Sequence, residues 1–476
     1  MKMKKIDIIP LPEKYEYLKG SVEINEAELV CNIDKSLGEE EYILTVSKDE
    51  LSIVGGSAKA IFYGSQSLKQ LGNKSKCIII KDKPAFPYRG FMLDCARHMF
   101  SVEDIKKMID AAASVKMNVM HWHLADDQGF RMWSERRPSA AIDGSVRRCS
   151  QFGNLIEDGP YGGYYTAEQM KEIVAYCSER FITVIPELDI PGHSSALLHV
   201  YPDISCRQEP VQVKTCQGIF DDVICPGKEK SFEVVTDIIE DMLEIFPGDY
   251  IHIGGDEVPK TNWKKCPDCQ KTISEHYLKD EEMLQGWFTN KIADFIRSRG
   301  RTPIVWNESL KSGILKDNTV VQMWMDRKKL SIDFANNGGR IIISDFFRYY
   351  CDYPYAMTPL FKTYKYKPIL KGIRNPASVL GVEAPVWTEY INNFERLSYM
   401  CFPRFTAVAE SGWTKEENKN CADFARRFRV YSRYLEEIGI FAASEEDWNP
   451  SATTRIRETL GFFNKTVRVR PPEKDR

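Results

Sequence analysis

Short apolar runs alternate with longer amphipathic stretches along the chain from residue 88 onward. The runs cover residues 90–94, 119–124, 184–187, 250–253, 303–306, 320–324, 340–344 and 381–387. Between them, helical patterns begin at polar capping residues, such as Ser101 and the capping box formed by Thr166 and Gln169. A strand followed by a helix, repeated eight times, favours a closed barrel over an open parallel sheet. We therefore predict an α/β fold, a (β/α)8 TIM barrel.

The first 85 residues have a different pattern. Apolar residues alternate at 42–46 and at 51–53 on either side of a polar turn, which predicts a β-hairpin. Ile61, Leu68 and Leu71 then fall on one helical face, and Gly72 stands where a left-handed C-cap residue is expected. A strand at 77–80 leads into a proline-bearing segment at 81–87. We predict a small α+β domain at 1–85, the barrel at 86–450, and a packed C-terminal tail at 451–476 that ends in mobile residues.

Composition and charge exclude several classes of function. The 476 residues include 65 Lys and Arg against 68 Asp and Glu, so there is no basic excess to bind nucleic acid. No run approaches the roughly 18 apolar residues of a membrane span, and the mean hydropathy is −0.38. The apolar stretch after the first lysines stops at Pro10, short of a signal peptide. We expect a protein that binds neither nucleic acid nor membrane. We expect it to be cytoplasmic as given, or secreted or periplasmic if a leader was removed. The sequence pattern indicates no particular oligomeric state.

The 13 cysteines are too few and odd in number for a disulfide scaffold, so we expect mostly buried thiols in a reducing compartment. One pair, Cys266 and Cys269, is separated by two residues, and Cys206 and Cys216 lie upstream at a plausible loop spacing. Tetrahedral zinc needs four ligands, and these four cysteines are candidates for a structural zinc site. Unpaired thiols are the first interpretation, ahead of zinc and then of a disulfide. No cofactor is expected to be required for the chemistry.

Polar residues gather directly after four consecutive predicted strands. They are Asp94 and Arg97, then Asp126 and Asp127, then Glu187, Asp189 and His193, and finally Asp256 and Glu257. A single strand-end charge is more often a helix cap or a surface ion pair. Four in succession favour a catalytic site, because barrel enzymes carry their catalytic groups at the carboxyl ends of the strands.

The segment YIHIGGDEV at 250–258 is the strongest single element. Its two glycines allow a tight turn and a close approach by a ligand. The adjacent acids Asp256 and Glu257 cannot both ionise freely in a tight site, so one pKa should rise, which makes a general acid. Neighbours in sequence are poorly arranged as the opposed acid and nucleophile of an ordinary retaining glycosidase, whose carboxyls lie about 5–5.5 Å apart. Another group must supply the nucleophile.

Four longer segments carry a family resemblance. They are RGFMLDCARH at 89–98, NVMHWHLADDQGFR at 118–131, PELDIPGH at 186–193 and HIGGDEV at 252–258. In this order they resemble the motifs of β-N-acetylhexosaminidases of glycoside hydrolase family 20, and the resemblance extends over about residues 40–415. It implies a retaining, exo-acting hydrolase of terminal β-linked GlcNAc or GalNAc. It also implies substrate-assisted catalysis, in which the 2-acetamido oxygen of the substrate attacks the anomeric carbon and gives an oxazolinium intermediate.

The resemblance also implies residue roles. Glu257 corresponds to the general acid and later base, and Asp256 to the group that accepts a hydrogen bond from the acetamide N–H. His193 and Asp189 match the pair that tunes the protonation of the acid, although a buried histidine–carboxylate pair can be purely structural. Arg97 matches an arginine that binds sugar hydroxyls at the non-reducing end, with a structural ion pair as the alternative.

Aromatic and acidic residues further along complete the predicted sugar site. Trp306, Trp324 and Trp387 each end a predicted strand and are large for a barrel core, which favours a hydrophobic cup for the acetamide methyl and the sugar face. By resemblance, the remaining candidates are Tyr350 for the acetamide carbonyl, Asp352 and Glu389 for hydroxyls, and Asp126, which has no assigned contact.

Two residues depart from the family pattern. Asn307 and Glu383 stand where Asp and Gln are usual, which predicts an altered supporting hydrogen bond and a shifted aglycone preference, respectively.

The alternative functions are a disaccharide-releasing (lacto-N-biosidase-like) or chitooligosaccharide-specialised relative, a catalytically silent sugar-binding protein, and a zinc hydrolase. The acids and arginine assigned above favour a closed pocket and exo action. A zinc hydrolase using His121 and His123 is disfavoured because no HExxH-like set accompanies them.

Overall fold

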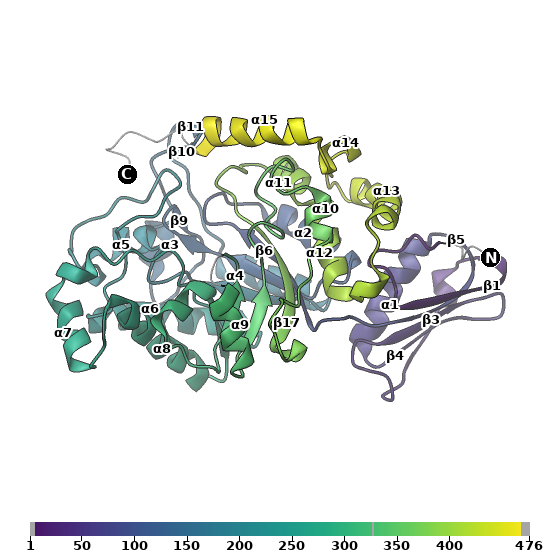
Figure 1. Ribbon diagram of the computed structural model, residues 1–476, viewed down its shortest axis with the longest axis horizontal. Helices are drawn as coiled ribbons and strands as arrows, with labels where there is room; N and C mark the ends of the chain where they lie inside the picture. The colour runs from purple at the N-terminus through teal and green to yellow at the C-terminus, as the bar shows by residue number, and fades with distance from the viewer. Residues whose placement is uncertain (1–4, 326–327, 468–476) are drawn as a thin grey trace.

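The computed structural model describes residues 5–325 and 328–467. It shows two domains along the long axis of the molecule, with the N-terminal sheet at one end and the barrel at the other (Figure 1). The predicted α/β barrel preceded by a small α+β domain is confirmed.

The described part of the N-terminal domain is a five-stranded sheet with one α-helix and a short 3-10 helix at Glu26–Glu28. Its strands have the order β1-β5-β3-β4-β2, with bounds β1 (Lys14–Glu23), β2 (Val30–Ile33), β3 (Tyr42–Val46), β4 (Leu51–Gly55) and β5 (Lys74–Asp82). The predicted hairpin is β3 and β4, and helix α1 (Ala58–Leu71) ends at Gly72 with φ 71°. Strands β1 and β2 were not predicted, because their residues are mostly exposed and lack a clear alternation.

Eight parallel strands close the barrel in the order β12-β13-β14-β15-β16-β17-β6-β7. They are β6 (Tyr88–Asp94), β7 (Val119–His123), β12 (Thr183–Glu187), β13 (Tyr250–His252), β14 (Thr302–Trp306), β15 (Val320–Met323), β16 (Arg340–Ile343) and β17 (Val379–Val386). Each contains part of one of the eight predicted runs. Their register pairs Asp94 with His123, and Glu187 with both His123 and His252, so the strand-end polar residues lie at one level.

Helices surround the barrel. Their bounds are α2 (Val102–Ser114), α3 (Pro138–Ile142), α4 (Ala167–Ser178), α5 (Ser195–Val200), α6 (Glu229–Ile245), α7 (Pro267–Glu275), α8 (Glu281–Ser298), α9 (Lys328–Asn336), α10 (Leu360–Tyr364), α11 (Phe394–Cys401), α12 (Arg404–Trp413), α13 (Cys421–Glu437), α14 (Glu445–Trp448) and α15 (Ala452–Phe462). The short strands β8 (Ala125–Asp126), β9 (Gly129–Phe130), β10 (Ser150–Phe152) and β11 (Leu155–Glu157) lie in the loops after β7. The Ser101 cap and the capping box at Thr166 are both present. In the described part of the chain, no helix combines the length and apolar character needed to cross a bilayer.

Buried charges join the two domains. Lys116 of the barrel lies 3.1 Å from the Asp82 carboxylate of β5, and both side chains are fully buried. The indole of Trp413 donates to the same carboxylate at 3.0 Å. These contacts fix the small domain against the barrel.

The segment predicted as a tail contains helix α15, and the backbone of Thr466 just after this helix lies against Gly153 between β10 and β11. The ring of Phe462 lies 5.6 Å from that of Tyr353 and 5.4 Å from that of Tyr390. The mobile end was predicted for the last residues of the chain, and 468–476 lie outside the described residues. The helix therefore borders the region where the catalytic loops meet.

Candidate active site

A pocket of about 300 Å³ lies at the carboxyl ends of the barrel strands, a size at the lower end of small-molecule sites. It is lined by Arg97, Asp189, His193, Gln217, Asp256, Glu257, Trp324, Met325, Phe346, Tyr350, Asp352, Tyr353, Trp387, Glu389 and Tyr390. All of the predicted catalytic and sugar-binding residues line it except Asp126 and Trp306.

The loop after β13 delivers the two adjacent acids to this pocket. Gly254 and Gly255 have φ of 59° and 101°, and a Cβ on Gly254 would stand 1.6 Å from an Asp189 carboxylate oxygen. The N–H of Gly255 donates to the same oxygen at 3.0 Å. The two glycines therefore let the turn pack directly on Asp189. Glu257 itself has φ 46°, a strained conformation that the surrounding structure must hold.

His193 lies between the acids and a pair of supporting carboxylates. Its Nε2 is 3.9 Å from Asp256 and 3.7 Å from Glu257. On the other side, its Nδ1 is 3.2 Å from Asp126 and 3.4 Å from Asp127. Burial lowers the pKa of His193, but Asp126 and its neighbours outweigh burial, so the pKa is raised well above the usual value. His193 therefore places a positive charge beside both acids.

The pocket acids hold their protons more tightly than free carboxylic acids do. Burial, together with the charges of Glu257 and more distant acids, raises the pKa of Asp256 to about 7, although His193 opposes this. Burial and then Glu308 raise the pKa of Glu257, again against His193. Burial and Asp256 raise the pKa of Asp189 well above its usual value. This environment makes a carboxylic acid available near neutral pH.

The guanidinium of Arg97 is fixed before any ligand arrives. It lies 2.6 Å from Asp126 and 3.4 Å from Asp94, and it donates to Gln128 at 2.9 Å. It also stacks over the indole of Trp387 at 5.0 Å. A fixed, planar donor of this kind suits adjacent hydroxyl groups.

The opposite wall combines aromatic rings with further acids. The rings of Trp324 and Tyr350 stack at 6.0 Å with an interplanar angle of 19°. Burial and Glu389 raise the pKa of Asp352 well above its usual value. Among the described residues, several buried polar atoms that have no protein partner belong to this lining: Asp189 Oδ2, Gln217 Oε1, Asp256 Oδ1, Trp324 Nε1 and Asp352 Oδ1. Such groups are expensive to leave unpaired, so they indicate a site built for a polar ligand.

Two predicted sugar-binding residues, Asp126 and Trp306, lie beneath the residues that line the pocket. Asp126 is 1% exposed and does not line the pocket, because its carboxylate is occupied by Arg97, His123 and His193. Trp306 is also 1% exposed, and its indole donates to Glu187 at 2.8 Å beneath the pocket. Asp126 therefore positions charged side chains. The ring of Trp306 packs with Trp324, Tyr350 and Trp387 in one aromatic cluster, so its place in the cup stays a prediction.

A second layer of buried charges lies under the pocket and centres on Glu187. His252 Nδ1 is 2.8 Å from this carboxylate, and His123 Nδ1 also contacts it. Burial raises the pKa of Glu187, but the charges of His252, His123 and His121 lower it well below the usual value.

Glu383 belongs to the same layer. It contacts His121 at 3.0 Å, accepts from Gln322 at 2.5 Å, and accepts from the hydroxyl of Tyr88. Burial lowers the pKa of His121, but the charges of Glu383 and Glu187 outweigh burial and raise the pKa to about 9. Glu383 is fully buried and does not line the pocket, so the structure gives it no contact through which to alter aglycone preference. Asn307 accepts from the backbone N–H of Trp324 at 3.3 Å, which is a supporting role.

Sequence analysis missed several residues of the site, among them Gln217 and Glu308 and the pocket-lining Met325, Phe346, Tyr353 and Tyr390. Gln217 lines the pocket from a long loop without periodicity, and no signal in the sequence marks it. Glu308 accepts a hydrogen bond from the Glu257 N–H at 3.2 Å and also pairs with Lys311. Its place directly after the strand β14 is a strand-end signal of the kind that identified the other acids.

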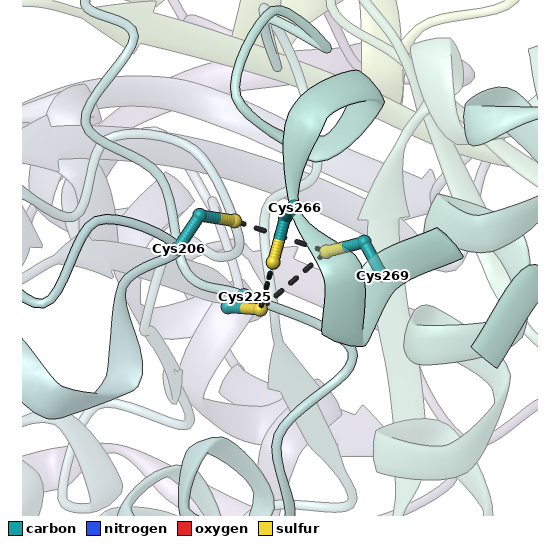
Figure 2. A group of neighbouring side chains, drawn as sticks. All are labelled: Cys206, Cys225, Cys266 and Cys269. Atoms are coloured by element: carbon teal, nitrogen blue, oxygen red, sulfur yellow. Dashed lines mark hydrogen bonds between the residues drawn. The ribbon is translucent and has the colours of Figure 1, made fainter. Parts of the chain in front are cut away.

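The predicted set of four cysteines is wrong in one member. Cys206, Cys266 and Cys269 lie together, but the fourth member of the cluster is Cys225 (Figure 2). Cys216 lies elsewhere, where its carbonyl accepts from Gln128 at 2.8 Å. The reason is a β-bridge between residues 205 and 224, which brings Cys225 beside Cys206.

Comparisons with known proteins agree with the geometry. Residues 86–416 match the model of the glycosyl hydrolase family 20 catalytic domain, and residues 25–83 match that of domain 2 of the same family. A beta-hexosaminidase of Porphyromonas gingivalis is 39% identical over 85% of this chain, which spans about half (54%) of that relative. A crystal structure of a beta-N-acetylhexosaminidase superposes with a TM-score of 0.86 at 30% identity, over 94% of this chain and 99% of the other. An exo beta-N-acetylglucosaminidase of Vibrio harveyi, solved in complex with N-acetylglucosamine, gives a TM-score of 0.83 at 28% identity, over 92% and 78%.

Proposed function

The chain belongs to glycosyl hydrolase family 20, and we propose that it is an exo-acting β-N-acetylhexosaminidase that retains the anomeric configuration. The observation that carries the proposal is the adjacent pair Asp256 and Glu257, both with raised pKa, beside the charged His193 in a small pocket.

In the first step, Glu257 gives its proton to the glycosidic oxygen as the bond to the anomeric carbon breaks. The acetamido oxygen of the substrate attacks the same carbon and forms a bound oxazolinium ion. Asp256 accepts a hydrogen bond from the acetamide N–H, and its negative charge stabilises the positive charge that develops on the ring. This new charge lowers the pKa of Asp256, so the carboxylate form becomes favoured as the reaction proceeds.

In the second step, the Glu257 carboxylate takes a proton from a water molecule, which attacks the anomeric carbon. The oxazolinium ring opens and regenerates the acetamide, with overall retention. The positive charge of His193 lies beside both acids and limits the energetic cost of their negative charges.

The remaining pocket residues bind one sugar. Arg97 presents a fixed guanidinium, and Asp352 and Glu389 offer acceptors for hydroxyl groups. The rings of Trp324 and Trp387 pack on the apolar sugar face and the acetamide methyl. These charged groups occupy the end of the pocket where a further sugar on the non-reducing side would lie. The pocket therefore accommodates one terminal sugar residue, which supports exo action over disaccharide release.

Product analysis on defined glycans tests exo action. Glycans that end in one β-linked GlcNAc or GalNAc should release the monosaccharide, with its β-configuration visible by NMR before mutarotation. Release of a disaccharide would identify the enzyme as a lacto-N-biosidase-like relative, and sugar binding without turnover would identify a silent binding protein.

Inhibition tests the cyclic intermediate. A thiazoline analogue of the oxazolinium ion should bind far more tightly than the product GlcNAc, because it resembles the transition state. Equal affinity for the two compounds would contradict substrate assistance.

A further inference from the structure

A cluster of four cysteines lies outside the pocket and plays no part in the reaction described above. Cys206 and Cys225 come from the loop between β12 and α6, and Cys266 and Cys269 come from the start of α7 (Figure 2). The four sulfur atoms all lie within 4.8 Å of one another. Three are fully or almost fully buried, and Cys206 is partly exposed.

The spacing of the sulfur atoms matches a tetrahedral metal site. The Sγ separations are 3.8 Å for Cys206 and Cys269, 3.7 Å for Cys225 and Cys266, and 3.4 Å for Cys225 and Cys269. Four thiolates around zinc at about 2.3 Å place neighbouring sulfurs about 3.8 Å apart. Cys206, Cys225, Cys266 and Cys269 form no disulfide, so no disulfide accounts for the cluster.

The backbone holds the four cysteines in place independently of the sulfur atoms. The bridge between residues 205 and 224 pairs the two loop segments, and the Cys225 N–H donates to the Ile204 carbonyl at 2.8 Å. Lys228 Nζ donates to the Ser205 carbonyl at 2.7 Å. A Cβ on Gly227 would stand 2.3 Å from the backbone of Asp268, so the loop lies directly against the start of α7. A site preorganised in this way loses little freedom when it takes an ion.

The surroundings also favour thiolate ligands. Cys266 is the N-cap of α7 and Cys269 lies in its first turn, where unpaired N–H groups and the helix dipole stabilise negative charge. Val223, Trp263 and Leu284 pack around the sulfur atoms and exclude water. Sulfur-only tetrahedral sites select zinc or iron among biological metals, and a set of four cysteines is common in structural zinc sites.

We propose that Cys206, Cys225, Cys266 and Cys269 bind one structural zinc ion that joins the loop after β12 to the loop after β13. These two loops carry His193 and the acids Asp256 and Glu257. The link to the chemistry is short: the N–H of Ile224 donates to the carbonyl of Pro191 at 2.9 Å, and Val258 packs against the cysteine cluster. The ion therefore positions the catalytic groups and takes no part in bond cleavage.

Metal analysis of the intact protein tests the site directly. The protein, produced with zinc in the growth medium and dialysed without chelator, should contain about one zinc per chain by mass spectrometry. Replacement of the zinc by cobalt should give the intense visible absorption of a tetrahedral cobalt thiolate. Three results would each overturn the proposal. They are iron in place of zinc, an intact mass lower by the four hydrogen atoms that two disulfides remove, and immediate reaction of all four cluster thiols with a thiol reagent.

Single substitutions assign the ligands. Cys206→Ser and Cys225→Ser should each lose most of the bound zinc, whereas Cys149→Ser, which removes a half-buried cysteine outside the cluster, should retain it. The ligand variants should lower kcat more than they raise KM, because the loops and not the sugar contacts are disturbed. Normal zinc content in both ligand variants would contradict the assignment. Metal content is measured without a substrate, so this test stands even if the proposed glycosidase activity is wrong.

Discussion

Two layers of buried carboxylates lie at the same end of the barrel, and they differ in their partners. In the lower layer, Glu187 and Glu383 contact histidines, and the pKa of each is lowered despite burial. In the upper layer, Asp256 and Asp352 each have an oxygen without a protein partner, and burial raises the pKa of each. Burial alone therefore does not identify a catalytic acid. The pocket acids are distinguished by buried carboxylate oxygens that have no hydrogen-bond partner in the protein and can therefore pair with the substrate.

This difference also separates stability from function. A buried acid with too few partners destabilises the folded state, while a paired acid supports it and becomes costly to remove. Each layer therefore predicts a distinct response to the same kind of substitution.

The largest effect is expected in the upper layer at Glu257. Glu257→Gln removes the proton donor, so kcat should fall by about 10²- to 10⁴-fold on substrates with a poor leaving group. A phenol leaving group of low pKa needs less protonation and should show a smaller loss in the first step. Steady-state kinetics on both substrates check this, and near-normal turnover of the poor substrate would remove Glu257 from its role.

The next effect is expected in the lower layer at Glu187. Glu187→Gln removes the charge that faces three histidines, and the loss of one partner from a buried ion pair costs about 3–5 kcal/mol of unfolding free energy. Urea unfolding measures the change. The matched control is Glu446→Gln at an exposed carboxylate, which should change stability by less than about 0.5 kcal/mol. Equal stabilities of the two variants would contradict the paired character of the lower layer.

Asp256→Asn should separate rate from stability. Loss of the negative charge beside the acetamide should reduce kcat by roughly 10²- to 10³-fold on acetamido substrates. In the folded protein Asp256 has a pKa of about 7, whereas an unfolded Asp titrates at about 3.9. The folded state thus keeps a proton that the unfolded state releases, and wild-type stability falls as pH rises through this window.

The Asp256→Asn variant has no titrating proton at this position, so it does not share this loss of stability. The melting temperature of the variant minus that of wild type should therefore be larger at pH 8 than at pH 5. Melting curves of both proteins at the two pH values check the sign. Parallel curves would show that Asp256 is ionised in the folded protein across the range.

The smallest effect is expected at Glu308, whose charge raises the pKa of both Asp256 and Glu257. Glu308→Gln should shift the pH profile of kcat/KM to lower pH and largely preserve its maximum, because the amide oxygen still accepts the Glu257 N–H. Lys311→Gln removes the cation that pairs with Glu308 and should shift the profile to higher pH. Shifts in the same direction for the two variants would contradict an electrostatic origin.

The barrel and most of the pocket were predictable from sequence for a definite physical reason. Strand ends in a parallel barrel converge, so acids such as Asp189 and Asp256 that follow different strands were expected to meet. The direction of a side chain at a strand end was not predictable: the indole N–H of Trp306 donates to Glu187, while its ring packs against that of Trp387. Cys225 was missed because its neighbour is set by pairing between distant loop segments, which spacing along the chain does not reveal.

In the proposed reaction the substrate's own amide is the nucleophile, and no side chain of the protein takes that role. The most direct measurement compares kcat/KM for two glycosides with the same leaving group, one with a 2-acetamido group and one with a 2-hydroxyl group. The wild-type protein should hydrolyse the 2-hydroxy sugar orders of magnitude more slowly, and Asp256→Asn should narrow this difference in kcat/KM. Equal rates for the two sugars with the wild-type protein would show that the amide is not the nucleophile.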